Sequence, residues 1–243
     1  MKDYLMDIVH HTHNLNFIDL VKVTGTDSET TIDGLADDKS VIIQARFKNP
    51  VPEFIGTFGM PNLGKLKTIL NLEDYRENAD ITVVKQIRNG EEILAGVHFE
   101  NAAKDFKNDY RFMVSEVVND KLKNVKFKGA KWGVDISPTV AGIMRMKAQA
   151  SANSESTTFV ARVENNNLVF YFGDPSSHSG NFVFQSNVQG SLTKAWNWPV
   201  TAVISILSLA GDKTFKISDD GAAMITVTSG VAEYNYILPA MQK

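Results

Sequence analysis

Apolar residues recur at helical spacing in four short segments of the chain, and these segments come in two pairs. The first covers about residues 3–14, the second begins at Pro61, the third covers 138–149, and the fourth begins at Pro199. Ser137 is the expected N-cap of the third helix, with Pro138 at its first position. The apolar faces expected to be buried are Leu5, Ile8, Val9 and Thr12; Leu63, Leu66 and Leu70; Val140, Ile143 and Met144; and Val200, Val203, Ile204 and Leu207.

Between and after these helices the apolar pattern changes to a period of two, which predicts strands. FIDLVKV and VIIQARF in the first half correspond to TTFVARV and FVFQSNV in the second, and all four are rich in β-branched and aromatic residues. Hairpin turns are predicted at Asn89-Gly90, at Asp220-Gly221 and at residues 165–167, which are all asparagine.

Each half therefore has the order helix, strands, helix and a further meander of strands. Such a duplication predicts an α+β protein made of two similar domains, with helices on one face of antiparallel sheets. We expect the first domain to cover residues 1–117 and the second to cover 134–243. Residues 118–133 are the expected interdomain linker.

Composition is that of a folded soluble protein. Of the 243 residues, 43% are hydrophobic, which is enough for an ordinary core, and none is cysteine, so disulfides and thiolate chemistry are excluded. Asp3 and Asp7 interrupt the apolar residues at the start, unlike a signal peptide, and no apolar run approaches the roughly 18 residues of a membrane span. We expect a cytoplasmic protein, in the host cell if it is viral.

Charge is distributed unevenly, although the net charge is only −3. A cation-rich surface on an acidic body binds phosphates at one place and repels them elsewhere. An exposed lysine-rich linker explains the same pattern equally well. The cluster consists of Lys121, Lys123, Lys126, Lys128 and Lys131.

Candidate groups for catalysis are sparse, so no catalytic residue, cofactor or metal is expected. The segment GTFGMPNLG lacks the glycine spacing of a phosphate-binding loop. His10 and His13 are the one histidine pair at a spacing that shares a helix face, and solvent-facing histidines are the simpler interpretation. Trp196 and Trp198, just before the fourth helix, are expected to pack against that helix rather than to stack on bases.

With helix, strands, helix and strands repeated across a linker, the chain resembles the DNA sliding clamps, most closely the trimeric clamps of tailed phages. In plan it resembles clamps of the proliferating-cell nuclear antigen (PCNA) type. The second half carries the likeness best, in SPTVAGIMRMKAQASANSESTTFVARVENNNLVFYFGD and in WPVTAVISILSLAGDKTFKISDDGAAMITVTSGVAEYNYILPA. The resemblance implies a homotrimeric ring, with helices inside and sheets outside, that encircles duplex DNA without reading its sequence. It also implies a DNA polymerase and a clamp loader as partners.

DNA contacts in such a ring would come from cations on the inner helices. Lys65 and Arg145 are the first candidates because each lies opposite the apolar face of its helix, and Lys67 and Lys147 are weaker ones. The first helix departs from this pattern, since Asp3 and Asp7 would face the DNA, with His10 in partial compensation.

Two further sites follow from the resemblance. The partner-binding site would include Val118 and Leu122 from the linker with Leu238, Pro239 and Met241 from the tail, unless these residues only pack linker and tail onto the domains. Subunits would join through strands at 110–117 and 181–188, with Gly180 leaving room for close approach. The interface residues are Tyr110, Phe112, Val114, Phe182, Val183 and Phe184.

Two other functional classes fit the duplicated pattern. One is a phage structural ring protein, such as a tail or baseplate component. The other is an enzyme on a duplicated scaffold, which would need a convergent polar cluster. Retention on circular but not linear DNA distinguishes a clamp from the structural ring.

Overall fold

A computed structural model of the chain describes residues 1–88, 90–123 and 127–241. Asn89 of the predicted hairpin, Lys126 of the lysine-rich stretch, and Gln242 and Lys243 of the tail lie outside this part. The chain divides into two compact units. Unit 1 comprises Met1–Asp37, Ile43–Val125 and Ser229–Tyr234, and unit 2 comprises Asp38–Ile42, Lys126–Thr228 and Asn235–Lys243.

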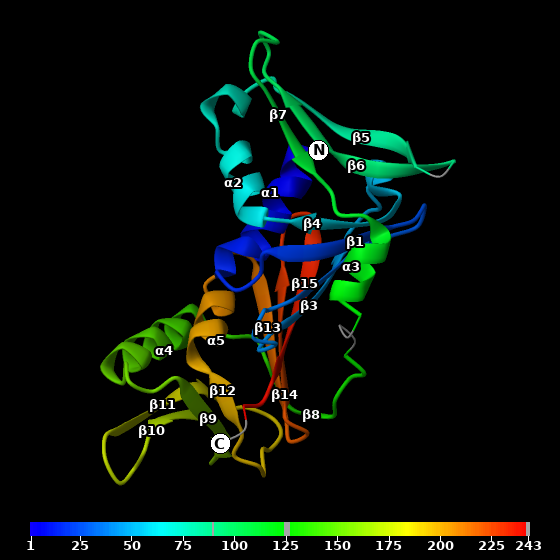
Figure 1. The fold of residues 1–243 in the computed structure, drawn as a ribbon. Helices are drawn as coiled ribbons and strands as arrows, with labels where there is room; N and C mark the ends of the chain where they lie inside the picture. Colours follow the sequence, from blue (N-terminus) through cyan, green and yellow to red (C-terminus); the bar gives the residue numbers. More distant parts are fainter. Residues whose placement is uncertain (89, 124–126, 242–243) are drawn as a thin grey trace. The chain divides into compact units, whose positions relative to one another are not determined.

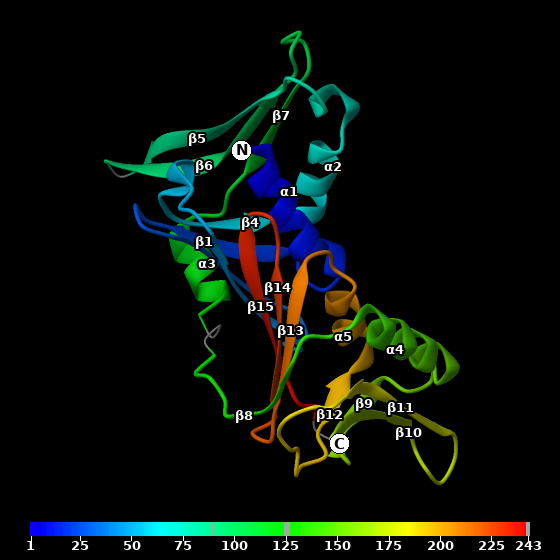
Figure 2. The ribbon, with the colours of Figure 1, turned by 180° about the vertical axis from the view of Figure 1, so that it is seen from behind.

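Unit 1 contains three helices, α1, α2 and α3, and seven strands among its described residues. Helices α1 and α2 lie side by side in both views (Figures 1 and 2). The elements are α1 (Lys2–His11), a 3-10 turn (His13–Leu15), β1 (Leu20–Gly25), β2 (Thr30–Leu35), β3 (Ile42–Phe47), a 3-10 turn (Pro52–Phe54), β4 (Gly56–Pro61), α2 (Leu63–Leu70), a 3-10 turn (Glu73–Tyr75), β5 (Asp80–Arg88), β6 (Glu91–Glu100), β7 (Lys107–Arg111) and α3 (Ser115–Lys121).

From α4 to β15, unit 2 repeats the order of α1 to β7 in unit 1, with its own pair of adjacent helices, α4 and α5 (Figure 1). Strand β15 begins with residues assigned to unit 1 and ends in unit 2. The elements are β8 (Trp132–Ile136), α4 (Val140–Ala152), β9 (Thr158–Glu164), β10 (Asn167–Gly173), β11 (Ser179–Ser186), β12 (Asn197–Pro199), α5 (Val200–Leu207), β13 (Asp212–Ser218), β14 (Ala222–Thr228) and β15 (Ala232–Pro239).

The sheets within each unit follow the same plan. In unit 1 the strand orders are β4-β1-β2-β3 and β5-β6-β7, and in unit 2 they are β11-β10-β9-β12 and β15-β14-β13-β8. Neighbours such as β1 and β2, β5 and β6, and β13 and β14 pair antiparallel, as short hairpin connections require. The predicted α+β fold with antiparallel sheets is therefore confirmed.

The core of unit 2 is an aromatic cluster that spans its two sheets. Strands β9, β10 and β11 contribute inward-facing phenylalanines, because alternate strand residues share one face. Phe215 of β13 joins them, with ring centroids 6.3 Å from both Phe170 and Phe184. The cluster is Phe159, Phe170, Phe172, Phe182, Phe184 and Phe215, all 7% exposed or less.

Turn chemistry follows the sequence closely. Asn165 and Asn166 both have positive φ, 50° and 59°, as a two-residue turn of type I′ requires, and they join β9 to β10. Gly221, with φ of +79°, lies in the predicted turn between β13 and β14. These two turn predictions are confirmed.

Several predicted boundaries were wrong. Helix α4 begins at Val140 rather than Pro138, and its N-cap is Thr139, whose Oγ1 accepts a hydrogen bond from the Gly142 amide at 3.0 Å. Trp198, expected to pack at the start of the fourth helix, lies in the short strand β12 directly before α5 and is fully buried. The strand expected at 110–117 ends at Arg111 and is followed by helix α3, so the alternation beyond that residue does not belong to a strand.

Gly142 allows α4 to approach strand β11 closely, and Gly142→Ala is expected to destabilise the protein. A Cβ there would lie 2.7 Å from the Phe184 carbonyl oxygen and 3.2 Å from Thr139 Oγ1. Helix propensity alone favours alanine by about 0.5–1 kcal/mol, but overpacking against backbone costs about 1–3 kcal/mol and should dominate. Urea unfolding measures the difference. The control is Ala141→Gly at an exposed position of α4, where only propensity should act; greater stability of Gly142→Ala would contradict the close packing.

Candidate functional site

Exposed cations are few on the four paired helices. On α2, Lys65 is exposed and Lys67 is partly buried, which agrees with their order as candidates. On α4, both Arg145 and Lys147 are exposed. Helix α5 carries no charged residue.

Arg145 is engaged by a strand rather than extended into solvent. Its Nη1 donates a hydrogen bond to the carbonyl oxygen of Val183 in β11 at 3.2 Å. Its guanidinium lies 5.6 Å from the centroid of the Phe182 ring. Arg145 is therefore positioned along the outer edge of β11, and its guanidinium is less available for phosphate than that of an unengaged arginine.

The buried face of α4 differs from the one predicted. Val140 is 79% exposed and Met144 is 62% exposed, whereas Gly142 and Met146 are buried. Placing Val140 and Met144 in the core was wrong because the helix packs through its small residue, Gly142. Lys147, the weaker DNA-binding candidate on this helix, is also exposed.

Asp7 of α1 is not a solvent-facing carboxylate, contrary to the prediction. Its Oδ2 accepts a hydrogen bond from the Tyr234 hydroxyl at 2.7 Å, and its Oδ1 lies 3.4 Å from Nδ1 of His11. The His11 and Tyr234 rings stack with centroids 4.4 Å apart. Of the charges predicted to face DNA from this helix, only Asp3 and His10 are exposed.

The described lysines of the lysine-rich stretch are all exposed. Lys121 ends helix α3, Lys123 follows it, and Lys128 and Lys131 precede β8. The first residues of the expected linker thus form part of a helix. Lys123 lies 3.1 Å from Asp120, an exposed pair that contributes little to stability.

The two strands predicted to join subunits are both terminal in their sheets. β7 ends the order β5-β6-β7, and β11 ends the order β11-β10-β9-β12. Beyond β7, Met113 exchanges backbone hydrogen bonds with Gly59 of β4. The unpaired edge of β7 is therefore limited to Lys107–Arg111. Both strands therefore present unpaired backbone groups within the described residues.

The side chains predicted at this interface are mostly interior. Tyr110 is 2% exposed, with its hydroxyl donating to the Pro61 carbonyl oxygen, and burial raises the pKa of its phenol above the usual range. Phe112 stacks on Phe58 with centroids 4.2 Å apart. Phe182 and Phe184 belong to the aromatic core, Val114 precedes α3, and Val183 is partly exposed.

The predicted partner-binding residues also divide between core and surface. Val118 and Leu122 of unit 1 are buried, and a Cβ on Gly59 would lie 2.9 Å from a methyl of Val118. Leu238 of unit 2 is buried in β15, whereas Pro239 is exposed and Met241 is 42% exposed. Met241 pairs through its backbone with Asn197, its amide donating to the Asn197 carbonyl oxygen at 2.9 Å.

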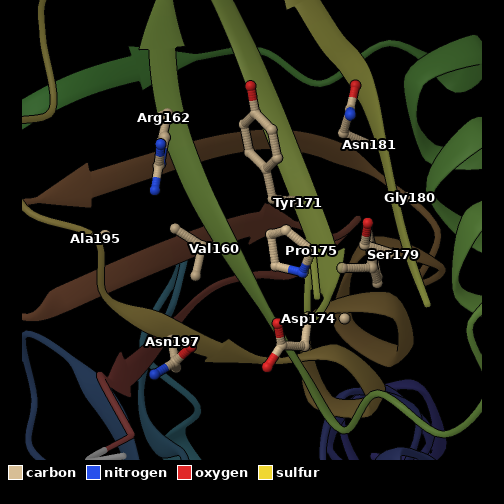
Figure 3. Close-up of a pocket in the computed structure, with 12 residues that line it drawn as sticks. Val160, Arg162, Tyr171, Asp174, Pro175, Ser179, Gly180, Asn181, Ala195 and Asn197 are labelled. Carbon is tan, nitrogen blue, oxygen red and sulfur yellow. The ribbon is translucent and has the colours of Figure 1, made fainter. Parts of the chain in front are cut away.

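A cavity of about 600 Å³ lies on the sheet of unit 2 (Figure 3). Arg162 and Tyr171 project from adjacent strands, with the guanidinium 5.3 Å from the ring centroid. The Tyr171 hydroxyl donates to Glu164 at 2.7 Å, which raises the pKa of the phenol. Asp174 at the other end accepts two hydrogen bonds from Ser176, at 2.8 Å each, and so stabilises the turn there. These contacts hold the lining side chains together and do not form a nucleophile with a base.

The histidines are distributed among different partners. His13 Nδ1 lies 3.3 Å from Asp19, and His98 Nδ1 lies 2.9 Å from Asp109. Over residues 1–88, 90–123 and 127–241, no group of three His, Asp or Glu side chains could hold a metal ion. In the same residues no helix is long and apolar enough to cross a membrane.

Comparison with known proteins shows the fold. No family model and no curated protein matches the sequence. A. fulgidus PCNA, solved with the C-terminal region of FEN-1 bound, matches with a TM-score of 0.67 at 10% identity, over 100% of this chain and 95% of that one. PCNA from Thermococcus kodakaraensis matches with a TM-score of 0.66 at 13% identity, over 98% of this chain and 97% of that one. The predicted sliding-clamp fold is confirmed: this chain has the two-domain α+β fold of PCNA.

Proposed function

We propose that three copies of this chain form a ring that encircles duplex DNA and tethers a DNA polymerase for processive synthesis. The observation that carries the proposal is the PCNA fold over the whole chain. Two strands with open edges, β7 and β11, support it because each copy then offers two different edges. Such a head-to-tail contact closes into a ring when the rotation returns to its start.

In the proposed ring, tethering is topological and needs no catalysis. Weak contacts with phosphates allow sliding, so a sparse set of cations suits the function better than a continuous basic groove. We propose Lys65 and Lys147 as the principal phosphate contacts, with Lys67 secondary. Arg145 is proposed to act at the subunit contact, since its guanidinium already lies on β11.

The proposed partners are a DNA polymerase and a clamp loader. The proposed source of the chain is a phage, whose replication proteins act in the cytoplasm of the host cell. A short apolar peptide of the polymerase would bind next to the tail of unit 2, where Pro239 and Met241 are exposed. Leu238, buried in β15, would support this surface from within unit 2 rather than contact the peptide, whereas Val118 and Leu122 are buried in unit 1.

Retention on circular DNA tests the ring. The protein is mixed at micromolar concentration with nicked circular duplex DNA, so that subunits assemble around the DNA, and the mixture is separated by gel filtration. We expect co-elution with the circle and release when a restriction enzyme linearises it. Equal retention on circular and linear DNA would contradict encirclement.

Charge reversal tests the proposed phosphate contacts. Lys65→Glu with Lys147→Glu should reduce retention on circular DNA several-fold at moderate salt and flatten its salt dependence, because each lost phosphate contact lowers the slope by about 0.9. Lys85→Glu with Lys104→Glu makes the same charge change at exposed positions outside the paired helices. If both double variants behave alike, net charge rather than these two side chains governs the interaction.

A further inference from the structure

The two units differ at one sheet edge. In unit 2, strand β8 covers β13, with Ile136 opposite Phe215 and Val134 opposite Ile217. In unit 1, β5 holds the position of β13, since each follows the second helix of its unit and opens the final meander. Yet β5 ends its sheet, and no described strand covers it.

The space that β8 fills in unit 2 has a counterpart in unit 1. On its far side β8 meets the loop after β11: Val134 bridges Gly190, and the Ser191 amide donates to the Gly133 carbonyl oxygen at 3.1 Å. The corresponding loop of unit 1 follows β3 and contains Pro52 and Glu53. Between this loop and β5 lies a cavity of about 430 Å³, lined by Met1, Pro52, Glu53, Ile81, Thr82, Val83 and Lys85, which we call the β5 slot.

The loop side of the β5 slot is fixed by buried contacts, whereas its strand side is partly exposed. On the loop side, the Val51 amide donates to Thr30 Oγ1 at 2.9 Å in the core, and Phe54 is fully buried. On the strand side, Ile81 and Val83 are only partly buried, and Ile87 farther along β5 is 81% exposed. An open strand edge with exposed apolar side chains is what proteins normally cover.

The length of the open edge matches one short strand. β5 pairs with β6 in one register from Asp80 to Val84, and the register shifts between Val84 and Lys85. This regular stretch of five residues equals the length of β8, Trp132–Ile136. In β8, Val134 and Ile136 are buried while Asp135 points outward to Lys216, 3.2 Å away.

We infer that the β5 slot is a docking site for one extended strand of a partner protein, which pairs antiparallel with Asp80–Val84. The strand carries apolar residues at alternate positions, as β8 does, and these cover Ile81 and Val83. Main-chain hydrogen bonds supply the binding energy and the alternate side chains supply the selectivity, as in other cases of strand addition. This surface is separate from the β7 and β11 edges and does not depend on DNA binding.

A grafted strand gives the first test. The sequence of Trp132–Thr139 is fused ahead of Met1, because Met1 lines the slot and α1 begins directly after it, as α4 begins directly after Thr139. Hydrogen exchange of the full chain should slow at least about tenfold at those amides of residues 80–84 that point to the open edge, and the melting temperature should rise by several degrees. The control fusion carries proline in place of the copies of Val134 and Ile136, which cannot pair, and should change neither quantity.

A free peptide gives the second test. The synthetic peptide KWGVDIS, residues 131–137, is titrated into the unfused protein, and exchange of residues 80–84 should slow in a saturable manner. The grafted protein should not respond, since its slot is filled. If hydrogen exchange at residues 80–84 is unchanged in both experiments, the inference is overturned. Protection of β7 or β11 in place of β5 also overturns it. Neither outcome depends on the result of the DNA experiments.

Discussion

Replacing Val183 with proline is expected to convert the proposed trimer into folded monomers. Val183 lies in β11, the terminal strand of its sheet, and its carbonyl oxygen accepts a hydrogen bond from Arg145. In a regular strand the amide and carbonyl of one residue point to the same side, so we expect the Val183 amide to face the open edge as its carbonyl does, next to the register shift between β10 and β11. Proline removes this donor and is tolerated in edge strands where the amide faces outward.

Light scattering after gel filtration measures the change in mass, and circular dichroism verifies the fold. Val183→Thr retains the amide and a β-branched side chain, so it should remain trimeric. Retention on circular DNA should fall together with the trimer. A Val183→Pro variant that keeps its trimeric mass would mean that β11 does not form the subunit contact.

Phe170→Ala is expected to cost about 3–5 kcal/mol of the free energy of unfolding, the range for a phenylalanine deleted from a packed core. Phe170 is fully buried at the centre of the aromatic cluster. Its ring centroid lies 4.6 Å from that of Phe159 and 4.5 Å from that of Phe184. The cavity left behind cannot close readily because strands on both sides fix the surrounding rings. A loss of this size is a large part of the 5–15 kcal/mol typical of whole proteins.

Urea unfolding followed by tryptophan fluorescence reports this loss, since Trp198 is buried in the same unit. Ile87→Ala serves as the control, because the Ile87 side chain is apolar but 81% exposed and its truncation should cost little. Equal effects of the two substitutions would contradict the central position of Phe170.

Strands and turns were readable from the sequence because their signals are local. The alternating phenylalanines of FVFQSNV and the paired asparagines at 165 and 166 each specify a geometry within a few residues. The duplication of the domain was then predicted from the order of these elements along the chain. Long-range packing was not needed for these predictions.

The predicted buried faces of α1 and α2 are confirmed, but that of α4 was wrong because small residues are not counted as apolar. The spacing of Val140, Ile143 and Met144 indicated a buried face, whereas α4 packs through Gly142 against the Phe184 carbonyl. Only a partner backbone at close range makes a glycine the contact residue, and the sequence does not encode that proximity locally.

Helix α3 was missed for a related reason. Its buried residues Val118 and Leu122 have the i, i+4 spacing of a helix, but the surrounding lysines favoured a linker. Alternation from Tyr110 onward then extended a strand through the start of this helix. The charge of Lys65 on α2 could be located from the sequence, while the contact of Arg145 with β11 required the fold.

The outward surface of α4 has a kinetic consequence for the proposed ring. Val140, Met144 and Ala148 give this helix a surface with no hydrogen-bond donor along its middle, and Lys147 stands to one side. A protein that diffuses along DNA slows each time a bound phosphate must be released before the next is met. An apolar surface forms no such bond, so Val140, Met144 and Ala148 would add little friction, and Lys147 would supply most of what α4 contributes. The rate of one-dimensional diffusion would then be set by the few lysines, and Met144→Lys should slow it without altering the ring.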